Sequence, residues 1–378
     1  MAQLSSEELN AFRATAVAFG KRRLKPWLER TLPDGDPAEI PALLAEARQI
    51  GLLAAAGPDE PGGDTGVWGR QSQAGPGLSL ALLSTVAESC AGIANCLHQA
   101  GLGASLLALD PDPPAGLAAP ALTENGFLPD HAAVYDPGHG FAAIETRLEA
   151  GNGGHRLSGR KSVVLLPPGT KTAAVFARDD EGWALAAADL SASGVSVREV
   201  GPALGLTAAR PVQLDFERAP ARRLGGRCDD ETMLDHLARH WYGQVAIAAG
   251  TAAGAVAEAV RYASERYQGG TEIIRHPAVA MMLAEAQASV AACRALLPES
   301  EPRSALEHAA SAAEAKIAGL PLCCRAVTEC LQVLGGYGYM EDYGLEKRYR
   351  DVHTLRCAGG SPAAIRQFVA SLRREEKT

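Results

Sequence analysis

Aromatic side chains, long apolar runs and clustered basic charge are all scarce in this chain, and each scarcity excludes a class of protein. Aromatic residues make up 5% of the 378 residues, so a large β-barrel or sandwich is not expected, and small aliphatic side chains between helices should form the core. No run approaches eighteen uninterrupted apolar residues, and the first ten residues are polar and acidic. Neither a membrane span nor a signal peptide is predicted, and we expect a cytoplasmic protein.

Basic charge and a cysteine framework are also missing. The formal net charge is −8 at pH 7, with only short Lys/Arg runs, which excludes nucleic acid as the expected partner. No C-x-x-C pair occurs, and several cysteines lie in Ala/Leu-rich helical sequence, so buried free thiols are favoured over metal ligands or disulfides. The eight cysteines are Cys90, Cys96, Cys228, Cys293, Cys323, Cys324, Cys330 and Cys357.

What is present is a globular composition arranged as helix, strand and helix again. With 47% hydrophobic and 21% charged residues the chain can bury a core, and its length predicts two or three domains at about 150 residues each. Hydrophobic periodicity predicts helices over 5–53, 78–109 (interrupted near Gly101 and Gly103), 229–267, 277–297 and 304–334. Short β-branched or alternating runs predict strands over 141–146, 162–166, 173–177 and 195–197, with turns at 151–154 and 179–182.

This pattern predicts an α+β fold in three domains. Residues 1–118 form an N-terminal helical domain, 119–227 a small middle β-domain, barrel-like or sandwich-like, and 228–378 a C-terminal four-helix bundle. A loop rich in Gly and Pro is expected at 57–63.

The most informative segment is 330–351, which reads C-L-Q-V-L-G-G-Y-G-Y-M-E-D-Y-G-L-E-K-R-Y-R-D. It closely resembles the C-terminal signature of the acyl-CoA dehydrogenase family, in which Q-x-x-G-G-x-G leads through an acidic-aromatic turn to R-D. Three further segments agree with that family in order: A-L-T-E at 121–124, S-G-R-K at 158–161, and the stretch from Tyr262 to Ile273. The resemblance spans essentially the whole chain.

The resemblance implies the fold above and an enzyme that oxidises an acyl-CoA thioester to the trans-2-enoyl thioester. Such enzymes bind FAD at subunit interfaces of a tetramer and pass electrons to an electron-transfer flavoprotein. A carboxylate removes the α-proton while the β-hydrogen leaves as hydride, which requires a base in a dry pocket.

Several cofactor positions of the family are matched. Arg266 matches the arginine that meets the FAD pyrophosphate, and Thr123 matches the threonine at the start of the β-domain. Gln332, Gly335 and Gly336 match the element that reaches the dinucleotide of a neighbouring subunit. Gly270 also matches, although the aromatic residue expected before it is Gly269. Taken alone, Gly335-Gly336 is equally compatible with a helix C-cap, and for Arg266 alone a solvated helix-end arginine is favoured. Together and in register they favour cofactor binding.

The catalytic positions depart from the family. The usual glutamate aligns with Gly359, which cannot accept a proton, and Arg366 then falls on the family arginine beyond it. Some members place the base on the first long helix of the C-terminal bundle, and that position is His240, followed by Trp241 in place of an arginine. An imidazole can take a proton near neutral pH, but a packed or hydrogen-bonded histidine is favoured.

Other departures affect the flavin side. The segment that normally contacts the flavin ring is Val163-Val164-Leu165, which loses a hydroxyl at Leu165, and the segment after Thr123 differs over 124–130. Three further side chains are weaker candidates. His98 reads as a core histidine, Glu88 as a helix-surface or intersubunit ion-pair residue, and Glu124 as part of the β-domain entrance. Cys357 near Gly359 reads as a buried inert thiol.

These matches and losses leave three hypotheses. The leading one is a degenerate, base-less subunit of a heteromeric acyl-CoA dehydrogenase, of the kind used on fatty-acyl or steroid side chains. Its homologous sister chain supplies the catalytic Glu, and FAD occupancy in this chain is reduced. The alternatives are a stand-alone acyl-CoA or acyl carrier protein dehydrogenase with His240 as displaced base, and an oxygen-using flavoenzyme of the same fold. The expected partners are an acyl-CoA thioester, the sister subunit and an electron-transfer flavoprotein, with no metal, nucleic acid or membrane.

Overall fold

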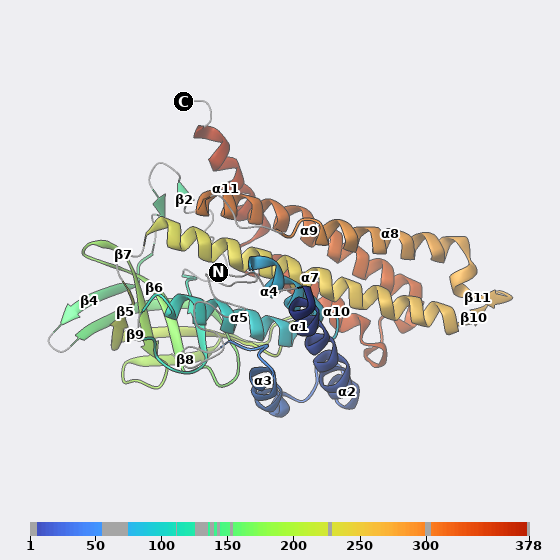
Figure 1. The fold of residues 1–378 in the computed structure, drawn as a ribbon, viewed down its shortest axis with the longest axis horizontal. Helices are drawn as coiled ribbons and strands as arrows, with labels where there is room; N and C mark the ends of the chain where they lie inside the picture. The colour runs from blue at the N-terminus through green and yellow to red at the C-terminus, as the bar shows by residue number, and fades with distance from the viewer. Residues whose placement is uncertain are drawn as a thin grey trace.

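The computed structural model describes residues 6–54, 75–110, 112–124, 135–136, 140–141, 144–151, 154–225, 229–298 and 304–375. Figure 1 shows a β-domain at one end of the long axis and a set of long helices that runs to the other end, with the N-terminal helices packed along one side. The predicted α+β architecture of N-terminal helices, small β-barrel and C-terminal helical bundle is confirmed. The predicted 57–63 loop, the 125–130 departure and Cys228 lie outside the described residues.

The N-terminal part is helical throughout its described length. Its elements are α1 (Ser6–Phe19), a π-helical turn (Gly20–Leu24), α2 (Lys25–Arg30), a 3-10 turn (Pro37–Glu39), α3 (Ile40–Gln49), α4 (Gly75–Ala87) and α5 (Ala91–Leu107). Every residue of α5 is buried, including the polar residues Asn95, His98 and Gln99. Such an all-round buried helix belongs in the centre of a molecule rather than on its surface.

The middle part is a small closed barrel. Strands β6, β4, β5, β9 and β7 follow one another, and β7 pairs again with β6, while β1 joins at β6 and β8 at β9. Side chains such as Leu157, Val175, Leu214 and Phe216 fill its interior. The strands are β1 (Ala118–Ala121), β4 (Arg147–Gly151), β5 (Gly154–Leu166), β6 (Thr172–Asp179), β7 (Gly182–Asp189), β8 (Val195–Glu199) and β9 (Arg210–Arg223), with a separate hairpin of β2 (Tyr135–Asp136) and β3 (Gly140–Phe141).

The C-terminal part is a bundle of long helices. Its elements are α7 (Asp230–Glu265), the hairpin of β10 (Tyr267–Gln268) and β11 (Thr271–Glu272), a 3-10 turn (Ile273–Arg275), α8 (Pro277–Arg294), α9 (Ala305–Leu334), two 3-10 turns (Gly335–Tyr337 and Glu341–Tyr343), α10 (Leu345–Cys357) and α11 (Pro362–Glu375). Side-chain caps start the two longest helices: Asp229 accepts from the Thr232 amide, and Ser304 accepts from the Glu307 amide. Gly335, with φ +58°, ends α9.

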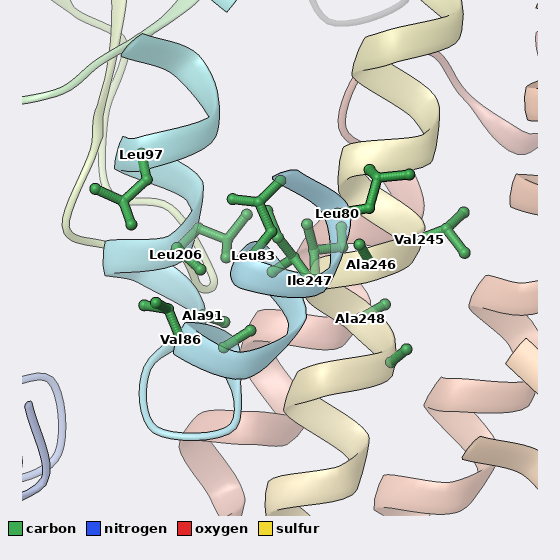
Figure 2. Close-up of a cluster of buried hydrophobic side chains, with 14 of the residues drawn as sticks. Leu80, Leu83, Val86, Ala91, Leu97, Leu206, Val245, Ala246, Ile247 and Ala248 are labelled. Atoms are coloured by element: carbon green, nitrogen blue, oxygen red, sulfur yellow. The ribbon is translucent and has the colours of Figure 1, made fainter. Parts of the chain in front are cut away.

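One core joins the helical parts. In Figure 2, Leu80 and Leu83 of α4 lie between α5 and the Val245–Ala248 segment of α7. Alanine is frequent in this core, which lets the helices approach closely, as the low aromatic content predicted. By length and composition, α7 and the segment 305–337 could each cross a membrane, but 78% and 50% of their most apolar windows are buried inside the molecule.

Two sequence predictions about local structure are wrong for identifiable reasons. Helix α5 runs unbroken through Gly101 and Gly103. The glycine at position 103 is explained by packing instead: a Cβ there would lie 2.4 Å from the Ala118 carbonyl oxygen, so its absence lets β1 approach the helix. In the 141–146 segment, residues 144–146 form no strand. The amides of Glu145 and Thr146 instead donate to the Glu124 carboxylate, at 2.6 and 3.2 Å.

The cysteine prediction is largely confirmed. The seven described cysteines are free thiols, and six are buried. Cys357 is exposed, so the expectation of a buried thiol is wrong at that position, which ends α10 at the surface.

Candidate active site

The two positions at which a base was expected lie in direct contact. Gly359, in the turn between α10 and α11, has φ +65°, and a Cβ built there would lie 2.5 Å from His240 Nε2. The same Cβ would lie 2.8 Å from Gln244 Nε2. The imidazole of His240 therefore fills the space in which a side chain at 359 would begin, and the site has no carboxylate at either position.

Both ring nitrogens of His240 are already hydrogen-bonded within the chain. Its Nδ1 lies 3.1 Å from Nε2 of His98, and its Nε2 lies 3.0 Å from the amide nitrogen of Gln244. The rings of His98 and His240 are stacked, with centroids 5.2 Å apart and planes 4° from parallel. The sequence-based preference for a hydrogen-bonded histidine agrees with this geometry.

His98 comes from α5 and is buried. Burial lowers the pKa of His98 from 6.5 to about 4, against the opposing effect of its hydrogen bond to the His240 carbonyl, because an imidazolium is poorly solvated there. The ring is therefore neutral at pH 7. It packs directly over Gly243, where a Cβ would lie 2.1 Å from the His98 ring, so glycine at this position admits the imidazole between α5 and α7.

A buried lysine completes the site. Lys316 of α9 is 4% exposed, and its ammonium donates to Gln244 Oε1 at 2.6 Å and to the Ala358 carbonyl. Trp241 Nε1 donates to the Gly359 carbonyl at 2.8 Å. Helices α7 and α9 thus hold the 358–359 turn by its backbone.

Sequence reasoning missed Gln244 and Lys316. Gln244 lies one helical turn after His240, on the same face, and that spacing could have indicated it. Lys316 lies in an Ala-rich helical run two residues after Glu314, and a lysine in such a run, if buried, needs polar partners.

The remaining titratable candidates lie outside this cluster. Glu88, at the end of α4, forms an ion pair with Arg294 at 2.8 Å within the same chain. Glu124 accepts from Lys161 Nζ at 2.5 Å and from the Thr146 hydroxyl at 2.5 Å. Burial would raise the pKa of Glu124, but the charge and hydrogen bond of Lys161 bring it below its usual value, so this carboxylate is a structural anion beneath β5.

The cofactor residues of the C-terminal part gather at the far end of the bundle. The Arg266 guanidinium lies over the Tyr337 ring, 5.7 Å from its centroid, which places it beside the Gly335–Tyr337 turn. Gln332, Gly335 and Gly336 are exposed, and a Cβ at either glycine would meet nothing within 4 Å. Gly269 and Gly270 form the tip of the β10–β11 hairpin with φ +67° and +88°, a two-residue turn that favours glycine and accounts for the missing aromatic residue.

The flavin-side residues gather at the barrel. The Thr123 carbonyl accepts from the Ser162 amide at 2.8 Å, so the 123–124 segment lies against the part of β5 that carries Val163 and Leu165. A groove of about 960 Å³ opens beside Ser162 and Val163, with Glu124 and Arg160 also in its lining. The barrel and the β10–β11 hairpin lie at opposite ends of the long axis (Figure 1), so Thr123 and Arg266 are far apart in one chain.

Comparison with known proteins decides which family has this arrangement. Residues 232–371, which include His240, Arg266, Lys316 and Gly359, match the family model described as acyl-CoA dehydrogenase, C-terminal domain. The C-terminal part of the chain is thus similar to the C-terminal domain of the acyl-CoA dehydrogenase family.

Relatives and solved structures agree with that assignment. The chain is 25% identical over 351 residues to the cyclohexane-1-carbonyl-CoA dehydrogenase of Syntrophus aciditrophicus, with 87% of each protein covered. It is 28% identical over 261 residues to the CarC subunit of the caffeyl-CoA reductase-Etf complex of Acetobacterium woodii, a match that covers 63% of this chain and 66% of CarC. Its fold is similar to an acyl-CoA dehydrogenase complexed with FAD from Bacillus anthracis, with a TM-score of 0.78, 22% identity, and 99% of this chain and 68% of the other covered.

The exposed end of the bundle fits the dinucleotide part of FAD. Arg266 forms no ion pair among the described residues, so its charge is available to a pyrophosphate, and the bare backbone at Gly335-Gly336 lets a ligand approach. The barrel side fits the ring less well for an acyl-CoA dehydrogenase, because the half-buried side chains there are Val163 and Leu165, which carry no hydroxyl. The family's cofactor residues are therefore better matched at the dinucleotide end, by Arg266 and Gly335-Gly336, than at the flavin-ring end, by Val163 and Leu165.

Proposed function

We propose that this chain is the base-less subunit of a heteromeric acyl-CoA dehydrogenase that acts on the Cα–Cβ bond of an acyl thioester. In this proposal a homologous sister chain supplies the catalytic glutamate. FAD held between subunits would supply the hydride acceptor for the β-hydrogen, and the expected electron partner is an electron-transfer flavoprotein in the cytoplasm. The name of the similar CarC subunit, which includes Etf, supports the last element.

The observation that carries the proposal is the contact between Gly359 and His240. No carboxylate is present at either base position, and the Nε2 atom nearest to residue 359 already lies in hydrogen-bond contact with the Gln244 amide, at 3.0 Å. A base must have a free lone pair aimed at the α-proton. This site instead uses its imidazole to fill space and to join α5, α7 and α9.

The division of the cofactor residues supports a shared FAD. Arg266 and Gly335-Gly336 lie at one end of the molecule and Thr123 at the other (Figure 1), so a single dinucleotide that meets both sets needs two chains. With the dinucleotide end intact and the flavin side altered, this chain is suited to complete the site of a neighbour.

The test is co-expression with a glutamate-bearing homologue from the same source. We expect a stable mixed complex in which FAD per chain rises above the level in either chain alone and which converts an acyl-CoA to its enoyl-CoA. The matched control carries Glu→Gln in the sister chain, which should keep the complex and FAD but lose the conversion. If no mixed complex forms and FAD content does not rise, the proposal is wrong.

A second candidate function, with His240 as the base of an active chain, is favoured by one observation. His240 Nε2 lies where the side chain at 359 would start, so the imidazole occupies the neighbourhood of the family base. If Gln244 moves aside when substrate binds, that nitrogen can take the α-proton. The variant His240→Ala in the chain alone separates the two: this candidate requires dehydrogenation by the unmodified chain and its loss in the variant.

A further inference from the structure

Four side chains form a continuous hydrogen-bonded chain across the candidate site. It runs from Lys316 on α9 through Gln244 and His240 on α7 to His98 on α5, with contacts of 2.6, 3.0 and 3.1 Å. Gln244 and Lys316 are almost fully buried, at 1% and 4% exposure, so water cannot readily replace either contact. Hydrogen bonds in such a chain must agree on the direction in which each proton points.

Lys316 fixes that direction at its own end. An ammonium group only donates, so the oxygen of the Gln244 amide must face it, and the NH₂ group must then face His240 Nε2. The NH₂ group only donates as well. Nε2 of His240 is therefore an acceptor, and the neutral ring carries its proton on Nδ1.

At the other end of this hydrogen-bonded series, the contact with His98 favours the opposite tautomer of His240. His98 Nε2 lies 3.2 Å from the His240 carbonyl oxygen, which only accepts, as well as 3.1 Å from His240 Nδ1. If His98 carried its proton on Nε2, both His240 atoms could accept from it, and the proton of His240 would lie on Nε2. That N–H would meet the NH₂ group of Gln244, donor against donor. The hydrogen bond from the charged Lys316 is the stronger of the competing contacts.

We infer that Lys316, acting through Gln244, is a positioning residue that holds neutral His240 with its proton on Nδ1 and its Nε2 lone pair toward the 358–359 turn. In this form His240 Nε2 carries no proton and cannot donate one on the side of residue 359, and it can accept one there only when the Gln244 amide moves aside. Removal of an α-proton needs an acceptor there, whereas the reverse reduction of an enoyl thioester needs a donor. The tautomer itself does not depend on the proposed function, and its consequence for proton transfer applies to the second candidate function, in which His240 is the base.

The experiment is a long-range ¹H–¹⁵N correlation spectrum of the full chain labelled with [¹⁵N]histidine at pH 7, in which the two neutral tautomers give different nitrogen shifts and cross-peak patterns. The variant His240→Gln identifies the signals of His240. We expect the Nδ1–H pattern in the unmodified chain. Lys316→Met frees the Gln244 amide to turn and should convert His240 to the Nε2–H pattern.

Gln244→Glu, which replaces the amide by an isosteric carboxylate, tests the same tautomer of His240 by the same spectrum. A carboxylate next to Lys316 accepts on both oxygens, so His240 Nε2 becomes a donor and the Nε2–H pattern should again appear. Leu320→Ala, one turn along α9 and buried at 1% exposure, is the control, which should lower stability without changing the pattern.

An Nε2–H pattern in the unmodified chain, or an Nδ1–H pattern that persists in both Lys316→Met and Gln244→Glu, would overturn the inference. The measurement needs no FAD, acyl thioester or second chain. Its failure therefore leaves the proposed function standing, and failure of the co-expression test leaves the tautomer of His240 as measured.

Discussion

The Cβ position of Gly359 and the Nε2 atom of His240 lie 2.5 Å apart, closer than two such atoms can approach. The glycine and the histidine are therefore one structural unit: the imidazole fits only because residue 359 has no side chain. In the family resemblance these are the two alternative positions of the base, and here the imidazole of His240 leaves no room for a side chain at residue 359.

Gly359→Ala should destabilise the chain by roughly 2–4 kcal/mol, because it adds a clash with His240 to the cost of a left-handed backbone. Gly344→Ala isolates the second cost, since Gly344 has φ +67° and nothing within 4 Å of a Cβ, and about 1 kcal/mol is expected there. In a His240→Ala background, Gly359→Ala should cost less than in the unmodified chain, because the remaining close contact is with the Gln244 amide. Urea unfolding measures the free-energy cost of Gly359→Ala, of Gly344→Ala, and of Gly359→Ala in the His240→Ala background. An equal cost of Gly359→Ala in both backgrounds would contradict the contact between residue 359 and His240.

The sequence predicts features with a strong local pattern better than features that depend on contacts between distant residues. Periodicity located α7, α8 and α9 to within a few residues, because long amphipathic helices carry a strong local signal. It misread Gly103 as a helix break, because the reason for that glycine is the approach of β1, which is distant in sequence. Strand β9 was not predicted either, and its longest pairing is with β5, which lies far from it along the chain.

The candidate site shows the same limit. Alignment by motif indicated Gly359 and His240 separately, but no local sequence pattern showed that the two residues are in contact. Lys316 was invisible as a site residue, since its role depends on the carbonyl of Ala358 and the amide of Gln244, 42 and 72 positions away. Local pattern finds the elements, and the site is made by packing between them.

Stability should fall as the pH drops from 6.5 toward 4 because of His98. Its pKa is lowered from 6.5 to about 4 in the folded chain, so between these values the unfolded state binds the extra proton and unfolding is favoured as pH decreases. The full contribution is about 3 kcal/mol as an upper bound. His98→Asn should flatten the dependence of the unfolding free energy on pH in this window. An unchanged slope in His98→Asn would show that His98 is not the group responsible.

Asp351→Asn should cost about 3–5 kcal/mol, because it leaves the Lys347 ammonium buried without its closest counter-charge, 2.6 Å away. The same carboxylate accepts the Leu206 amide at 2.6 Å, which ties α10 to the loop before β9. Glu149→Gln, which removes an ion pair with Arg218 whose side chains are both more than half exposed, is the comparison and should cost less than about 1 kcal/mol. Thermal unfolding of both variants measures the two losses of stability. Similar losses in Asp351→Asn and Glu149→Gln would refute the prediction.

Arg266→Gln should weaken FAD retention in the mixed complex by about tenfold or more, since it removes a charge-assisted contact to the pyrophosphate. Its effect on unfolding should be small, because the side chain is exposed and its described contact is the Tyr337 ring. Arg275→Gln, an exposed arginine just after the same hairpin that pairs with Glu272, is the control and should retain FAD. Equal FAD loss in the two variants would argue against a specific role for Arg266.

The measurement that tests the central claim most directly is the visible spectrum of the purified chain, alone and in the mixed complex, before and after addition of an acyl-CoA. A base-less subunit predicts little or no flavin absorbance in the chain alone and no bleaching by acyl-CoA, with a yellow complex that bleaches when the glutamate-bearing partner is present. A chain that carries flavin by itself and is bleached by an acyl-CoA would contradict the account.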